Sequence, residues 1–141
     1  MSGRRYTDLP ETPPVPHDFF TLPRHQRDVT VDGQPLTLSW VEAGSGPPLL
    51  LIHGLMTSAY SWRYVAPALA KQYRVIALDL PGAGKSGAPV GLSQSPQSLA
   101  TVLDAFVGAL GLGKVYVVGN SMGGYVSLWW SLARPTGSSA C

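Results

Sequence analysis

The sequence predicts an α/β fold in which a doubly wound, mostly parallel sheet follows an N-terminal antiparallel hairpin. Short apolar runs at residues 48–52, 73–78 and 115–118 alternate with segments of helical periodicity. Apolar runs without alternation are typical of strands that are covered on both faces, as in a parallel sheet. Strands that alternate with crossover helices form an open sheet with helices on both of its faces.

The first element is predicted to be a β-hairpin. Residues 28–31 and 36–41 are β-prone and roughly alternating, and they flank the turn signal Asp32-Gly33. Residues 1–23, which precede the hairpin, are dominated by Pro, Thr and charged side chains, with Phe19-Phe20 as their only aromatic pair. Because such a segment cannot assemble a core by itself, we expect it to be an extension on the surface.

Helices are predicted at residues 61–70, 95–110 and 122–134. Ser95 can cap the second helix, Pro96 suits its first turn, and Gly111 suits its end. Apolar side chains recur along this helix at three- to four-residue spacing, which gives it one face for the sheet.

Composition argues against several classes of partner. Ten Lys and Arg against eight Asp and Glu give a formal net charge of +2, which is too small for nucleic-acid binding. Cys141 is the only cysteine, so no disulfide framework or thiolate metal cluster is available. No apolar run approaches the ~18 residues of a membrane span, and the polar residues after Arg4-Arg5 do not fit a twin-arginine signal. We expect a cytoplasmic protein without a metal or organic cofactor.

A serine lies in the loop after the third apolar run, at a strand-to-helix junction. Gly119-Asn120-Ser121-Met122-Gly123 is a G-x-S-x-G pattern. On so sharp a turn the hydroxyl projects from the sheet edge, and the glycines allow strand and helix to approach closely. The first amides of the helix and its dipole face the same place. Ser121 is therefore a candidate nucleophile, and a serine that merely caps the helix is the alternative.

The first apolar run ends in His53-Gly54-Leu55. The amide of Leu55 could join the amide of Met122 to form the pair of donors that an oxyanion needs when a carbonyl is attacked. On this interpretation His53 organises the loop and does not transfer protons.

The second apolar run ends in the segment Asp79 to Ser86. Its Gly84-Lys85-Ser86 sequence resembles the end of a phosphate-binding loop. However, position 79, where that loop requires its first glycine, holds an aspartate that would repel a phosphate. Nucleotide binding therefore remains a weak alternative.

Taken together, these motifs resemble those of the α/β-hydrolase family over about residues 26–135. The first is a His-Gly oxyanion loop at His53-Gly54, and the second is a D-x-x-G-x-G-x-S turn with Asp79, Gly82, Gly84 and Ser86. The third is a nucleophile elbow from Gly119 to Gly123, and the three motifs follow the order of the family. The resemblance implies that residues 24–141 are the N-terminal portion of a hydrolase domain. It also implies that Ser121 is the nucleophile, that Leu55 and Met122 supply the oxyanion-hole amides, and that the turn is structural.

The activity implied by the resemblance is acyl transfer from a small-molecule carboxylic ester or a related substrate through Ser121. Members of the family that use an aspartate nucleophile, the dehalogenases and epoxide hydrolases, are disfavoured. The Gly-Asn-Ser-Met-Gly-Gly elbow is similar to that of hydrolases that cleave carbon–carbon bonds in ring-fission products. The glycine-rich oxyanion loop of that group is not matched by Leu55-Met56-Thr57-Ser58.

The acid and the histidine of the catalytic triad follow the serine in this fold, yet no His, Asp or Glu follows Ser121 here. We therefore expect a truncated and nearly inactive chain, and a catalytically silent fragment is the alternative to an enzyme. Residues 136–141 fit a one-base deletion in G/C-rich codons, which suggests a frameshift. Truncation would leave residues 115–118 as an apolar sheet edge and favour aggregation. The substrate, the lid and the oligomeric state stay open.

Overall fold

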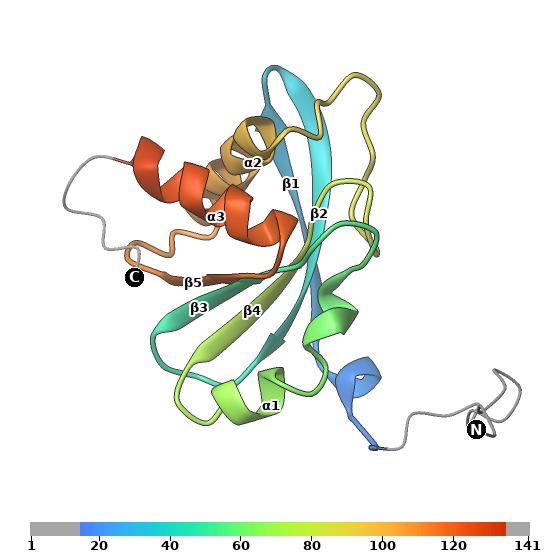
Figure 1. Cartoon of the computed structure of the whole chain (residues 1–141), viewed down its shortest axis with the longest axis vertical. Coiled ribbons are helices and arrows are strands. Elements are labelled where there is room, and N and C mark those ends of the chain that lie inside the picture. The colour runs from blue at the N-terminus through green and yellow to red at the C-terminus, as the bar shows by residue number, and fades with distance from the viewer. Residues whose placement is uncertain (1–14, 135–141) are drawn as a thin grey trace, which may run out of the picture.

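A computed structural model of the chain describes residues 15–134. The predictions for Arg4-Arg5, Cys141 and residues 136–141 lie outside the described residues. Figure 1 shows a twisted sheet with the helices α2 and α3 on one face and the short helix α1 near its lower end.

The sheet has five strands in the order β1-β2-β4-β3-β5. The hairpin strands β1 (Arg24–Val31) and β2 (Gln34–Ala43) pair antiparallel, and β2 continues antiparallel onto β4 (Arg74–Asp79). The strand β3 (Pro48–Ile52) lies parallel to both β4 and β5 (Tyr116–Gly119). The predicted fold class, a mostly parallel doubly wound sheet preceded by an antiparallel hairpin, is confirmed.

The hairpin turn has the geometry that its sequence predicts. Asp32 and Gly33 both have positive φ angles, 49° and 76°, and Val31 pairs with Gln34 across the turn. A two-residue turn with positive φ at both positions matches the right-handed twist of the flanking strands, and Asp-Gly is among its preferred sequences.

The long helices are α2 (Pro96–Ala109) and α3 (Met122–Ala133). Ser95 caps α2, because its hydroxyl accepts a hydrogen bond from the Ser98 amide at 3.2 Å. The end of this helix is followed by Gly111, whose φ of 61° is left-handed.

The helix predicted at residues 61–70 is wrong in extent. A 3₁₀ turn, η3 (Ala59–Trp62), and one α-helical turn, α1 (Ala66–Leu69), replace it. Pro67 lies in the first turn of α1, where a missing N–H is tolerated. The same residue cannot donate to the preceding turn, so a continuous helix through it is disfavoured.

Both faces of the sheet are packed. Leu50 and Ile52 on β3 belong to the core beneath α2 and α3, while Leu49 and Leu51 belong to the core on the other face. This double coverage explains why the strand is an unbroken apolar run. The second core also contains Phe19 from η2 (Phe19–Thr21), which is only 4% exposed. The described part of the proposed extension therefore contributes Phe19 to the core, with Leu22 packed against it, and the boundary of the extension at residue 23 stays a prediction.

One edge of the sheet carries exposed apolar side chains. Tyr116 and Val118 on the edge strand β5 are 43% and 42% exposed. The neighbouring helix α3 adds exposed apolar residues, namely Tyr125, Leu128, Trp129 and Leu132. An apolar edge strand with unpaired backbone groups is a template for association with another chain.

We predict that this edge drives self-association of the 141-residue chain. Tyr116→Lys should weaken self-association at least about tenfold, because a lysine on an edge strand must be desolvated when another strand pairs with it. Sedimentation velocity over a concentration series measures the effect. Phe20→Lys changes a side chain that is 80% exposed and lies on η2, outside the sheet, and serves as the control. Wild-type protein that stays monomeric at high concentration would contradict the prediction.

Candidate functional site

Ser121 lies on a strained turn between β5 and α3. Its φ of 55° and ψ of −119° are unusual for a residue with a side chain, and α3 begins at the next residue. Hydrogen bonds hold the turn, from the Asn120 amide to the Ile52 carbonyl at 3.0 Å and from the Gly124 amide to the Ser121 carbonyl at 2.9 Å. The side chain of Ser121 is exposed and makes no capping hydrogen bond, which disfavours the helix-cap alternative.

The glycines of the motif are required by close backbone contacts. A Cβ atom at Gly123 would lie 2.1 Å from the Ile52 carbonyl oxygen, and one at Gly119 would lie 2.3 Å from the Gly123 carbonyl oxygen. No larger residue fits at either position without displacing backbone. The strand β3, the strand β5 and the start of α3 therefore meet directly beneath Ser121.

The loop after β3 packs against this turn. A Cβ atom at Gly54 would lie 3.3 Å from the Ser121 Cβ and 3.9 Å from its Oγ. Leu55, the next residue, is 70% exposed. Within residues 15–134, the amides of Leu55 and Met122 have no partner among the turn, loop and cap hydrogen bonds. Both N–H groups thus remain available next to the serine.

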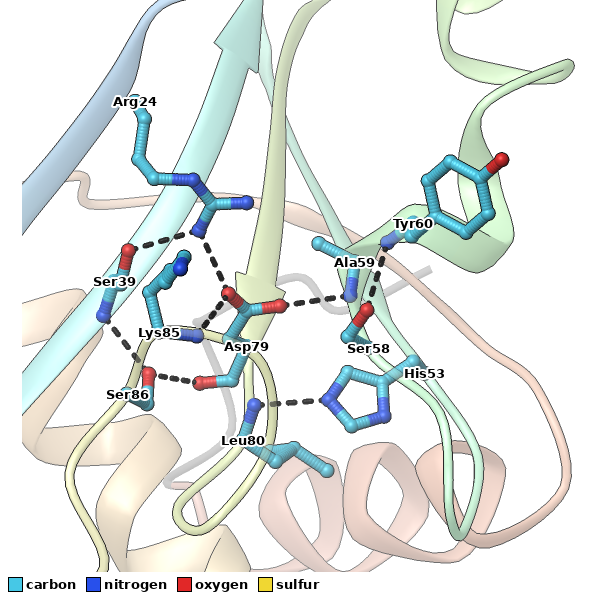
Figure 2. A network of polar contacts seen from close by, with 10 residues as sticks. All are labelled: Arg24, Ser39, His53, Ser58, Ala59, Tyr60, Asp79, Leu80, Lys85 and Ser86. Carbon is cyan, nitrogen blue, oxygen red and sulfur yellow. Dashed lines mark hydrogen bonds and ion pairs between the residues drawn. The ribbon is translucent and has the colours of Figure 1, made fainter. Parts of the chain in front are cut away.

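Two consecutive residues at the end of β4 hold the two ends of this loop. The Leu80 amide donates to His53 Nε2 at 2.9 Å, and His53 Nδ1 donates to the Gly54 carbonyl at 2.7 Å. At the other end, the Ala59 amide donates to Asp79 Oδ1 at 2.8 Å (Figure 2). Because a carbonyl can only accept, these bonds fix His53 as the neutral tautomer with its proton on Nδ1.

The turn from Asp79 to Ser86 wraps around a fully buried carboxylate. The Lys85 amide donates to Asp79 Oδ2 at 3.1 Å, and the Ser86 hydroxyl donates to the Asp79 carbonyl at 2.5 Å. Gly84 has a φ of 52°, and a Cβ there would lie 2.3 Å from the carboxyl group. Gly82 is also left-handed, with a φ of 80°. Since the turn encloses its own anion, the nucleotide-binding alternative gains no support.

Sequence reasoning missed one residue of this network. Arg24, on β1, donates from Nη1 to Asp79 Oδ2 at 2.7 Å and to the Ser39 hydroxyl at 2.9 Å (Figure 2). Nothing local in the sequence marks this arginine, because it lies 55 residues from Asp79. It is also on the antiparallel hairpin and not on one of the parallel strands.

A hollow of about 420 Å³ opens beside the loop that follows β3. Its lining is mostly apolar or backbone, with Leu55, Leu80 and Met122 as large apolar members and Gln94 as an amide. None of the lining residues is Asp, Glu, Lys or Arg.

In the part of the chain that the structure describes, neither a cluster of metal ligands nor a membrane-spanning helix is present. No three side chains of His, Cys, Asp or Glu gather there as a metal site would require. None of the helices in residues 15–134 has the length and apolarity to cross a bilayer.

We predict that His53 makes folding sensitive to mild acid. Burial lowers the pKa of His53 from its ordinary value of 6.5, and the Gly54 carbonyl and the Asp79 charge offset this only in part. As the pH falls through 6.5, the unfolded state therefore takes up a proton that the folded state does not. The stabilisation is complete above that pH and is lost below it, by up to about 1.4 kcal/mol per pH unit.

The variant His53→Gln has a side-chain oxygen that can still accept a hydrogen bond from the Leu80 amide but does not titrate. Its free energy of unfolding should fall less steeply with decreasing pH than that of the wild type. Urea unfolding at a series of pH values between about 7 and about 5 gives both slopes. Equal slopes for the two proteins would show that His53 does not titrate in this way.

The chain was compared with known proteins. A family model described as the alpha/beta hydrolase fold matches residues 47–137. The chain is 44% identical over 94 residues to the soluble epoxide hydrolase of Corynebacterium sp. (strain C12), covering 67% of this chain and 32% of that protein. It is also 44% identical over 93 residues to 2-hydroxy-6-oxo-6-(2'-aminophenyl)hexa-2,4-dienoic acid hydrolase of Metapseudomonas resinovorans, covering 63% and 32%.

Among solved structures, a thermophilic esterase from Thermogutta terrifontis aligns with a TM-score of 0.71 and 30% identity, over 77% of this chain and 41% of that one. The chain spans about a third of the length of these curated relatives. The predicted resemblance is confirmed by the family match, by hydrolase relatives and by the shared strand arrangement. The chain belongs to the alpha/beta hydrolase fold family.

Proposed function

We propose that this chain carries the nucleophile and the oxyanion donors of a serine hydrolase that cleaves carboxylic esters. The observation that supports the proposal is the left-handed backbone of Ser121, whose exposed side chain lies next to Gly54 in the loop that follows β3. Strained residues at the end of a strand are commonly kept for chemistry, because the strain has no structural benefit.

In the proposed reaction, Ser121 Oγ attacks the ester carbonyl carbon and loses its proton to a base. The carbonyl electrons move to the oxygen, and the amides of Leu55 and Met122 donate to the resulting oxyanion, aided by the positive end of α3. The tetrahedral centre then expels the alcohol, which takes up a proton. Water hydrolyses the acyl-Ser121 ester and releases the carboxylic acid.

The base is not His53 in this proposal. Both of its ring nitrogens are engaged, one with the Gly54 carbonyl and the other with the Leu80 amide. In this fold the acid and the base follow the nucleophile in chain order, and the chain spans about a third of its relatives. We therefore propose that the chain by itself reacts slowly, and that a catalytically silent hydrolase fragment is the alternative.

Serine at the elbow favours acyl transfer over epoxide opening, although an epoxide hydrolase is among the relatives. Attack of a serine hydroxyl on an epoxide carbon would produce an ether, which water cannot cleave by addition to a carbonyl. Attack on an ester produces an acyl-serine, which water does cleave. The residue at position 121 thus supports a substrate with a carbonyl group.

Cleavage of carbon–carbon bonds in ring-fission products is a second candidate, because one relative is a hydrolase of a dienoic acid. Such a substrate carries a carboxylate, which an apolar pocket accepts only beside a cation. Within residues 15–134, no Lys or Arg lines the hollow at the loop that follows β3. This favours an ester of an uncharged acid.

We predict that an uncharged alkyl fluorophosphonate labels Ser121. Mass spectrometry of tryptic peptides should place the adduct on residue 121, and Ser121→Ala should abolish it. Ser131→Ala removes another hydroxyl from α3, one that donates to the Ser127 carbonyl, and should leave labelling unchanged. Absence of any adduct on folded protein would favour the silent fragment.

We further predict that the charge of the probe matters. A fluorophosphonate with an alkyl arm should label Ser121 at least about tenfold faster than one whose arm ends in a carboxylate, since a tenfold change in rate is about 1.4 kcal/mol of barrier. The comparison uses arms of equal length in the same buffer. Faster labelling by the anionic probe would instead favour the ring-fission substrate.

A further inference from the structure

We propose that Arg24, on the N-terminal hairpin, is a positioning residue for the oxyanion loop. It would act through the Asp79 carboxylate, which holds the end of that loop at Ala59. The inference rests on the proposed function, because it concerns the placement of the Leu55 amide opposite Ser121.

Arg24 and Asp79 form an ion pair between a partly exposed cation and a fully buried anion. Their closest atoms, Nη1 and Oδ2, are 2.7 Å apart, and the side chains are 32% and 0% exposed. Arg24 reaches this position across the sheet, because β2 lies between β1 and β4 and places Ser39 opposite Asp79. Among residues 15–134, Arg24 is the cation that pairs with Asp79.

The two oxygens of the carboxylate have different partners. Oδ2 accepts from Arg24 and from the Lys85 amide, whereas Oδ1 accepts from the Ala59 amide (Figure 2). A carboxylate is planar, so two donors on one oxygen fix the direction of the other. Arg24 therefore orients the oxygen that binds the loop.

The loop between His53 and Ala59 is short and is held at both ends by β4. Leu80 fixes its beginning through His53, and Asp79 fixes its end through Ala59. Without Arg24, the buried charge of Asp79 would lose its compensating cation and the carboxylate would turn toward water. The end of the loop would then be released, and a displacement of about 1 Å at a catalytic donor can cost about 10²-fold in rate.

Inactivation kinetics separate positioning from simple stabilisation. The inactivation rate constant kinact and the binding constant Ki of an uncharged alkyl fluorophosphonate are measured at Ser121 for the full 141-residue chain, corrected for the folded fraction. Arg24→Ala should lower kinact at least about tenfold and leave Ki within about twofold. Loss of stability alone would leave both constants of the folded fraction unchanged.

Two further variants act as controls. Arg24→Lys should restore most of kinact, because a single nitrogen of Arg24 makes both contacts and an ammonium group can donate to the same two oxygens. Arg74 lies at the opposite end of β4 from Asp79 and forms an ion pair with Glu42. Arg74→Ala breaks that ion pair and should leave kinact unchanged. If Arg24→Ala does not fold, Arg24→Gln supplies a neutral variant that keeps an amide donor.

Hydrogen exchange keeps this inference separate from the proposed function. If wild-type Ser121 takes no label, the proposed function fails, and amide exchange of Ala59, whose N–H donates to Asp79, then tests the positioning. Arg24→Ala should speed exchange of this amide at least about tenfold, while Arg24→Lys and Arg74→Ala should not. Unchanged kinact in folded Arg24→Ala, or unchanged exchange where no label forms, would overturn the inference.

Discussion

The arrangement of the site depends on one buried carboxylate at the end of β4. Asp79 is inaccessible to water, so its charge is tolerable only where donors converge on it. Those donors come from segments distant in sequence, namely β1, the start of η3 and the turn that follows β4. The hydrogen bonds of this one side chain therefore fix the hairpin, the loop that follows β3 and the turn that follows β4 relative to one another. The loop that follows β3 in turn packs against Ser121 through Gly54, although Asp79 makes no hydrogen bond to the serine.

Much of this fold could be predicted from local patterns. Unbroken apolar runs indicated β3 and β4 because these strands are covered on both faces, and Asp32-Gly33 indicated the hairpin because only a turn with positive φ fits there. The run at β5 also indicated a strand, although Tyr116 and Val118 are exposed at the edge of the sheet. The short helical segment was harder to predict. The spacing of its apolar residues suits a helix, but Pro67 has no backbone N–H to donate to the preceding turn. The periodicity of apolar residues gives no information about such a missing donor.

The part of the site that could be predicted from the sequence is the part where close backbone contacts require glycine. Gly119, Gly123 and Gly84 mark places where a Cβ would collide with backbone or with a carboxylate, so their spacing indicates the folded geometry. Arg24 has no comparable signal. A charged residue on a strand usually faces solvent, and only the strand order places this one beside Asp79. Long-range pairings of this kind depend on topology, which one sequence does not specify.

The strand order also has a consequence for how the chain is made. The hairpin of β1 and β2 joins neighbours in sequence and can form early. By contrast, β3 lies between β4 and β5, both of which are synthesised after it. Its Leu-Leu-Leu-Ile run therefore has no hydrogen-bonded neighbouring strand on either side until the following helices and strands have emerged from the ribosome. During biosynthesis, a strand that ends up buried on both faces is therefore exposed until the segments that pair with it have been made.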